Sequence, residues 1–114
     1  MKASIDVLDM AIGIKVAILG DMGELGENTV ELHREVGEYA ANKVIDLVCA
    51  IGPVSKALAE GAKTGSNTKV LWYETKEEFI DALHDLILPG DNVLVKASHG
   101  MNFPEVVEAL QKLS

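Results

Sequence analysis

The sequence predicts an α/β domain: a Rossmann-like, three-layer fold with a mainly parallel sheet and helices on both faces. Short apolar runs alternate along the 114 residues with segments of helical periodicity. The runs are apolar almost throughout, as in parallel strands that are covered on both faces. Right-handed crossovers favour a doubly wound sheet with the strand order 3-2-1-4.

The first half of the chain contains two predicted strands. A short helix over residues 3–12 ends near Gly13, and the run from Lys15 to Leu19 forms the first strand. A helix is predicted over residues 28–43, because Asn28 and Glu31 have the spacing of a capping box. Residues 47–51 form the second strand.

The second half repeats this alternation. It contains predicted helices over residues 54–63, 75–87 and 103–113, and predicted strands over residues 69–73 and 92–96. Thr75 and Glu78 have capping-box spacing, and Pro104 is allowed in the first turn of the last helix. Residues 1–114 therefore form one domain.

Composition excludes several classes of function. The formal net charge of −8 makes nucleic acid and anionic membranes poor partners, and no apolar run approaches the roughly 20 residues of a membrane span. The single cysteine, Cys49, lies inside an apolar run, where we expect a buried, inert thiol. This cysteine usage fits a cytoplasmic protein.

The loop after the first strand carries an acidic residue, Asp21, at the carboxyl end of the strand, where ligands of parallel sheets bind. It runs from Gly20 to Gly26 with glycines spaced G-x-x-G-x-x-G, which is not the dinucleotide pattern. Asp21 and Glu24 would also repel a pyrophosphate. We expect Asp21 to orient an amine-bearing ligand, with a solvated glycine-rich turn as the alternative.

The loop after the fourth strand favours capture of an anion. Lys96 supplies a charge and Ser98 a hydroxyl group, and His99 follows directly. A hydrolase triad is disfavoured because Ser98 and His99 are adjacent and no G-x-S-x-G elbow surrounds the serine. A plain strand-end loop remains the alternative.

Three further residues are weaker candidates. His33 is expected to pack within its helix against the preceding loop, with a ligand contact as the alternative. Gly52 and Ser55 follow the second strand and are candidates for supporting a ligand. Histidine spacing and the single cysteine predict no metal site.

The motifs at these loops resemble the C-terminal domain of the Mur ligases, and among them the MurF type. The resemblance is carried by three segments: VAILGDMGELG at residues 16–26, ELHREVG at residues 31–37 and GDNVLVK at residues 90–96. The opening segment, residues 1–8, is similar to the helix after the family's interdomain hinge. The chain departs from the family pattern VKGSR at Ala97 and His99, and Phe103-Pro104 stands where the family has Met-Glu.

The resemblance implies an ATP- and Mg-dependent ligase that adds D-alanyl-D-alanine to UDP-N-acetylmuramoyl-tripeptide. It implies that Asp21 is the catalytic acid, that Lys96, Ser98 and His99 bind the incoming substrate, and that Met22 and Glu24 shape the first loop. The sequence contains no G-x-x-x-x-G-K-[ST] motif. We therefore expect the UDP-binding domain and the covalently linked central ATPase domain to lie outside this chain, and the isolated chain to be inactive. A free-standing small-molecule binding module is the main alternative, and an interaction domain is a second one.

Overall fold

The computed structural model describes residues 2–21, 28–65, 68–88, 90–97 and 103–112. Its helices are α1 (Lys2–Asp9), α2 (Thr29–Ala41), α3 (Ser55–Ala62), α4 (Lys76–Leu86) and α5 (Pro104–Gln111). Its strands are β1 (Lys15–Gly20), β2 (Leu47–Ile51), β3 (Lys69–Tyr73) and β4 (Asn92–Lys96). The predicted strand positions are confirmed, whereas α1 ends at Asp9, short of the predicted Ile12.

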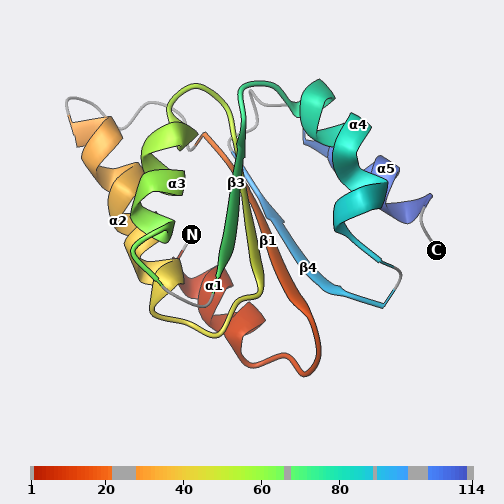
Figure 1. The fold of residues 1–114 in the computed structure, drawn as a ribbon, viewed down its shortest axis with the longest axis horizontal. Helices are drawn as coiled ribbons and strands as arrows, with labels where there is room; N and C mark the ends of the chain where they lie inside the picture. Colours follow the sequence, from red (N-terminus) through yellow and green to blue (C-terminus); the bar gives the residue numbers. More distant parts are fainter. Residues whose placement is uncertain (1, 22–27, 66–67, 89, 98–102, 113–114) are drawn as a thin grey trace.

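The four strands form one parallel sheet in the order β3-β2-β1-β4, as predicted (Figure 1). The central strands β1 and β2 are buried along their whole length, and the outer strands β3 and β4 are partly exposed. Central parallel strands have no solvent-facing side, which explains why their sequences are apolar without alternation.

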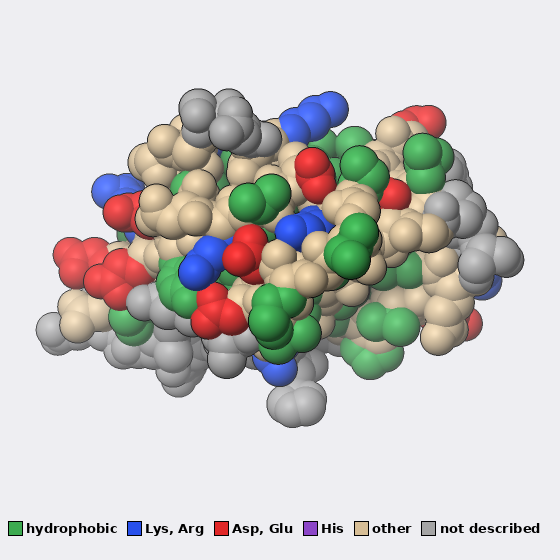
Figure 2. Space-filling model, turned by 90° about the horizontal axis from the view of Figure 1, so that it is seen from below, with side chains coloured by type: hydrophobic (Ala, Val, Ile, Leu, Met, Phe, Trp, Pro, Cys, Tyr) green, Lys and Arg blue, Asp and Glu red, His purple; other side chains and the backbone are tan. Residues whose placement is uncertain are grey.

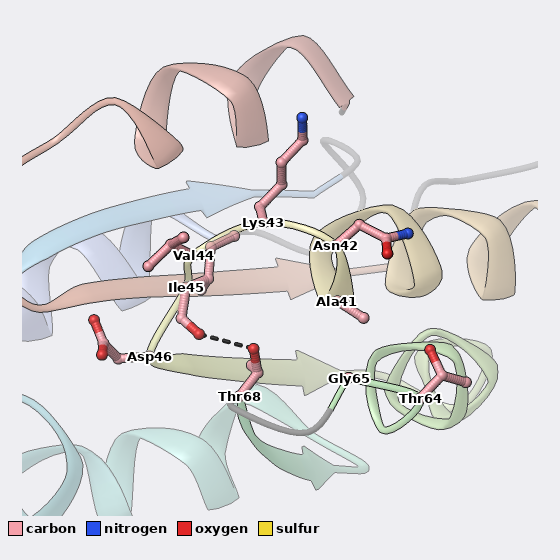
Figure 3. Close-up of a pocket in the computed structure, with 9 residues that line it drawn as sticks. All are labelled: Ala41, Asn42, Lys43, Val44, Ile45, Asp46, Thr64, Gly65 and Thr68. Carbon is pink, nitrogen blue, oxygen red and sulfur yellow. Dashed lines mark hydrogen bonds between the residues drawn. The ribbon is translucent and has the colours of Figure 1, made fainter.

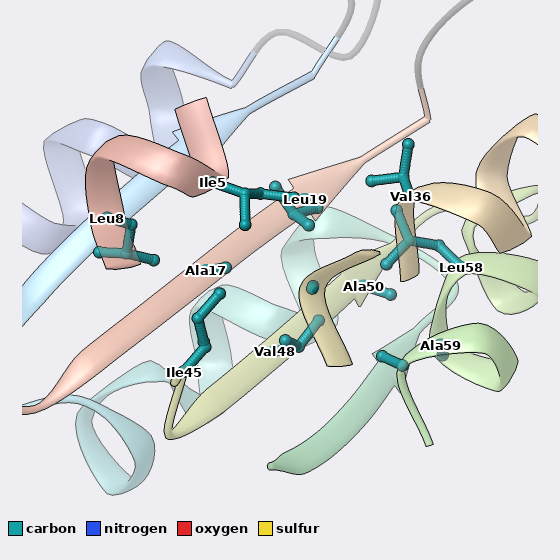
Figure 4. Packing of buried hydrophobic residues seen from close by; sticks show 12 residues of the cluster. Ile5, Leu8, Ala17, Leu19, Val36, Ile45, Val48, Ala50, Leu58 and Ala59 are labelled. Atoms are coloured by element: carbon teal, nitrogen blue, oxygen red, sulfur yellow. The ribbon is translucent and has the colours of Figure 1, made fainter. Parts of the chain in front are cut away.

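Helices cover both faces of the sheet, which confirms the three-layer prediction. α1, α2 and α3 lie on one face, and α4 and α5 lie on the other (Figure 1). Alternate residues of a strand point to opposite faces, so β1 and β2 contribute to both cores. The core beneath α1, α2 and α3 includes Leu19, Val36 and Leu58 (Figure 4). The core beneath α4 and α5 includes Ile18, Phe79 and Val106.

The two predicted helix caps have different outcomes. Thr75 accepts a hydrogen bond from the Glu78 backbone N–H at 3.3 Å, so this cap is confirmed. The Asn28 cap is wrong, because its side chain makes no capping hydrogen bond. Asn28 has φ −94° and ψ 15°, rather than the extended conformation from which a cap side chain reaches the first turn.

Exposed apolar side chains lie at the amino ends of the strands. Met10, Ile12 and Ile14 precede β1, Val44 precedes β2, and Leu88 precedes β4. Figure 2 looks at this end of the molecule and shows hydrophobic atoms in several groups separated by charged and polar atoms. Within the described ranges, no helix is long and apolar enough to cross a membrane.

Candidate functional site

The topology directs attention to the carboxyl ends of β1 and β4. After β1 the chain continues to α2 on one face of the sheet, and after β4 it continues to α5 on the other. Ligands of open parallel sheets bind at such a switch point. Leu19 of β1 pairs with Lys96 of β4, so Asp21 and Lys96 lie at the same corner of the sheet.

Asp21 binds the start of α3, which lies 34 residues further along the chain. Its Oδ1 accepts hydrogen bonds from the Ser55 backbone N–H at 2.8 Å and from Ser55 Oγ at 2.7 Å. Its Oδ2 accepts a longer one from the Val54 backbone N–H at 3.4 Å. The cap position of α3 is Val54, whose side chain has no polar atom, so Asp21 takes the place of a capping side chain.

Asp21 also has a structural role. The carboxylate is partly buried and satisfies N–H groups of a helix start. Its removal must therefore lower stability as well as any activity in which it takes part.

Gly52 lies against the same carboxylate. It has φ +117°, a conformation that L side chains rarely adopt. A Cβ at this position would lie 2.5 Å from Asp21 Oδ1 and 2.8 Å from Oδ2. The Trp72 indole N–H donates to the Gly52 carbonyl oxygen at 2.8 Å and ties this turn to β3. Gly52 is therefore required both for its backbone conformation and for the space that Asp21 occupies.

Lys96 ends β4 with an exposed side chain. Leu94, two residues earlier, packs against the core beneath α1, α2 and α3. Because side chains two apart in a strand share a face, Lys96 lies on that face too. Asp21 reaches α3 on the same face. Two opposite charges thus share one corner of the sheet.

His33 is fully buried one turn into α2. Its Nδ1 lies 2.7 Å from the Thr29 carbonyl oxygen, the position four residues earlier in the same helix. This geometry agrees with a histidine that packs within its helix. The other predicted site residues, Met22, Glu24, Ser98 and His99, lie outside the described residues.

Phe103 and Ala97 pack against Gly20, a contact that the sequence pattern did not predict. A Cβ on Gly20 would lie 2.6 Å from Phe103 Cζ and 2.8 Å from Ala97 Cβ. An open surface depression of about 650 Å³ lies between the end of β4 and α5, and it is lined by Phe103 and Ala97 and also by Val95, Lys96, Pro104, Val107, Glu108 and Gln111. The departures from the family pattern at positions 97 and 103 are thus in contact with the same strand end.

A second pocket lies at the opposite, amino-terminal edge of the sheet. It has a volume of about 460 Å³ and is formed by the segments before β2 and β3 (Figure 3). Polar side chains around it bond to nearby backbone groups: Thr68 donates to the Ile45 carbonyl oxygen at 2.8 Å, and Asn42 donates to the Glu38 carbonyl oxygen at 3.0 Å. We therefore assign it no ligand.

Cys49 is buried in β2, as expected from the sequence. Burial raises the pKa of its thiol to about 12, against a smaller opposing effect of Lys69. A thiol in this state is a poor nucleophile and a poor metal ligand. In the part of the chain that the structure describes, no three His, Cys, Asp or Glu side chains are grouped as metal ligands would be.

Comparison with known proteins identifies a family. A family model described as the Mur ligase, glutamate ligase domain, matches residues 1–99. The UDP-N-acetylmuramoyl-tripeptide–D-alanyl-D-alanine ligase of Bacillus subtilis is 35% identical over 113 residues, which cover 96% of this chain and 25% of that protein. The same ligase of Escherichia coli is 34% identical, over 98% of this chain and 24% of that protein.

Solved structures agree with the sequence relatives. A crystal structure of MurF from Acinetobacter baumannii superposes with a TM-score of 0.87 at 30% identity, and the match covers 98% of this chain and 25% of that one. MurF ligase from Thermotoga maritima, solved with ADP, has a TM-score of 0.74 at 30% identity over 96% of this chain and 24% of that one. The chain thus spans about a quarter of the length of the relatives that it matches. By its sequence and its fold, it belongs to the Mur ligase C-terminal family.

Proposed function

We propose that this chain is the C-terminal part of a cytoplasmic ligase that joins D-alanyl-D-alanine to UDP-N-acetylmuramoyl-tripeptide at the expense of ATP. The observation that carries this proposal is the specificity of the match. The relatives quoted above share one name and align with nearly the whole chain at 34–35% identity. The structural neighbours bear the same family name.

The charges at the carboxyl edge of the sheet support the proposed substrate. D-alanyl-D-alanine carries an ammonium group at one end and a carboxylate at the other. Asp21 and Lys96 offer the complementary pair of charges at one corner of the sheet. In the proposal, Asp21 accepts hydrogen bonds from the amine of the dipeptide. Lys96, together with Ser98 and His99, binds the carboxylate of the dipeptide.

The remaining candidates have supporting roles in this proposal. Met22 and Glu24 shape the loop after β1, and Gly52 leaves room for the Asp21 carboxylate. His33 is buried in α2 and supports the start of that helix through its contact with Thr29. Such a domain contributes by aligning the amine with the acceptor carboxyl group and by excluding water, both of which accelerate amide formation.

We expect the nucleotide phosphates to bind outside this chain. The 114 residues contain no P-loop motif, and the acids Asp21 and Glu24 in the segment after β1 would repel a pyrophosphate. We place the binding of ATP and Mg²⁺ in the central domain of the complete ligase. By its resemblance to the family, we expect the UDP-bearing acceptor to bind a further domain of the complete ligase.

The experiment is a coupled measurement of phosphate release and amide formation by the complete ligase that carries this chain. We expect turnover only when ATP, UDP-N-acetylmuramoyl-tripeptide and D-alanyl-D-alanine are all present. The isolated 114-residue chain is the matched control and should release no phosphate above background. Turnover that is independent of D-alanyl-D-alanine would refute the substrate assignment. ATP hydrolysis by the isolated chain would refute the division of labour between domains.

A further inference from the structure

The start of α3 depends on a side chain from another strand. Val54 occupies the cap position, and its apolar side chain cannot accept a hydrogen bond from the first turn. Asp21 supplies the missing acceptor from the end of β1, through contacts with Val54 and Ser55. A negative charge at a helix N-terminus is also favoured by the helix dipole. Hydrogen bonds therefore tie the Asp21 carboxylate to the first turn of α3.

Ser55 donates two hydrogen bonds to the Asp21 carboxylate. Its side chain is fully buried, so its hydroxyl group requires a partner inside the protein. Both its backbone N–H and its Oγ donate to the same atom, Asp21 Oδ1, at 2.8 and 2.7 Å. Two donors from one residue fix the position of Oδ1, whereas Oδ2 has only the longer 3.4 Å contact with Val54 among the described residues. With respect to the described residues, Oδ2 therefore keeps most of its capacity to accept a further hydrogen bond.

The carboxylate is also confined from the side of β2. Its atoms lie so close to the Gly52 Cα that a Cβ there would be 2.5–2.8 Å from three of them. Gly52 is itself held by Trp72 through its carbonyl oxygen and by the Tyr73 carbonyl oxygen through its backbone N–H, at 2.8 and 2.9 Å. β1, β2, β3 and α3 thus all contribute to the orientation of one acid.

We infer that Ser55 is a positioning residue for the ligation step: it acts through Asp21, by fixing Oδ1 so that Oδ2 is aimed before the amine substrate binds. The inference rests on the proposed function and deepens it. Ser55 itself does not touch the substrate, since its hydroxyl is buried and used by Asp21. Loss of the hydroxyl lets the carboxylate rotate, and misalignment of a reacting group lowers the rate.

The test is a double-mutant cycle in the complete ligase, with kcat/KM for D-alanyl-D-alanine as the readout. Ser55→Ala should lower kcat/KM about tenfold, equivalent to roughly 1.4 kcal/mol of transition-state free energy. In an Asp21→Ala background, the same substitution should lower kcat/KM no further, because the group through which it acts is gone. Asp21→Asn keeps an oxygen for Ser55 and should melt close to the wild type, while its kcat/KM falls because the charge is lost.

A matched control separates positioning from general loss of stability. Thr75→Ala removes the cap of α4, at the same edge of the sheet but beyond β3. Both Thr75→Ala and Ser55→Ala should lower Tm by about 4 °C, and Thr75→Ala should leave kcat/KM unchanged at temperatures well below Tm.

Three outcomes would overturn the inference. These are an unchanged kcat/KM in Ser55→Ala, an equal fall in both backgrounds, and an equal fall in Thr75→Ala. If the wild type shows no turnover dependent on D-alanyl-D-alanine, the proposed function fails and the inference fails with it. That result is distinguishable from the other three, in which the wild type is active.

Discussion

Gly37 of α2 lies against the backbone of Leu58 in α3. A Cβ on Gly37 would be 1.9 Å from the Leu58 carbonyl oxygen, and a Cβ on Gly61 of α3 would be 2.2 Å from the Arg34 carbonyl oxygen. The two helices therefore cross at direct backbone contact, with a glycine on each side. Leu58 and Ala62 are buried at this crossing. Gly37, the last residue of the ELHREVG motif, is thus explained by packing.

Gly37→Ala should destabilise the protein although alanine favours helices. Helix propensity alone would add up to about 1 kcal/mol, but the new methyl group must push two helix backbones apart. We expect a net loss of about 2 kcal/mol or more in the free energy of unfolding, measured by urea denaturation. Glu35→Ala, at an exposed position of the same helix, is the control and should change stability by less than about 0.5 kcal/mol. A stabilised Gly37→Ala variant would show that α2 and α3 do not cross at this contact.

Cys49 should be unreactive in the folded protein. Burial raises the pKa of its thiol to about 12, so the thiolate is scarce at neutral pH and the sulfur is shielded from reagents. We expect no labelling by iodoacetamide over hours in native buffer and complete labelling in denaturant, as followed by mass spectrometry. Rapid labelling under native conditions would contradict the burial of β2.

A hydrogen bond between α1 and α2 should raise the pKa measured for Tyr39. The Tyr39 hydroxyl donates to Asp6 Oδ1 at 2.5 Å, and Lys43 lies 3.4 Å from the same oxygen. The hydrogen bond with Tyr39 lowers the pKa of Asp6, and the same bond raises the pKa of Tyr39. The contribution of Asp6 to stability is present above its unfolded pKa and is lost as pH falls through its lower folded value. The contribution of Tyr39 is present below its unfolded pKa and is lost as pH rises through its raised folded value.

Ultraviolet absorbance of the phenolate measures this effect. In Asp6→Asn, Tyr39 should titrate nearer its ordinary pKa of about 10, because the negatively charged acceptor is gone. Tyr73, whose pKa is raised mainly by burial, should keep its value and serves as the internal reference. A Tyr39→Phe variant identifies which transition belongs to which tyrosine. Equal titration of Tyr39 in the wild type and in Asp6→Asn would contradict the contact.

Lys96 should affect substrate binding with little effect on stability. Its side chain is exposed, so Lys96→Ala should leave Tm within about 2 °C of the wild type. In the complete ligase, we expect KM for D-alanyl-D-alanine to rise about tenfold or more, as for the loss of a charge-assisted hydrogen bond. Lys69→Ala is the control, because Lys69 is an exposed lysine at the amino end of β3. Equal KM values for the two variants would remove Lys96 from the substrate site.

The sequence predicted most of the fold because its strands are short apolar runs bounded by glycine or polar residues. Residues 15–19, 47–51, 69–73 and 92–96 are strands as predicted, and the observed order agrees with the doubly wound order that right-handed crossovers favour. Local conformation was harder to predict. Asn28 has the sequence of a cap but not the backbone angles of one, because a cap depends on how the preceding loop enters the helix.

For the candidate site, the sequence by itself determined which residue types meet at the switch point. The proximity of Asp21 and Lys96 follows from the strand order, because the ends of neighbouring parallel strands lie at the same edge of the sheet. Only the tertiary structure decided what Asp21 does there. Its partner Ser55 is 34 residues away, and no local pattern links them. Hydrogen bonds between loops depend on how the sheet brings strand ends together, so the tie between β1 and α3 could be seen only once β1 and β2 were packed side by side.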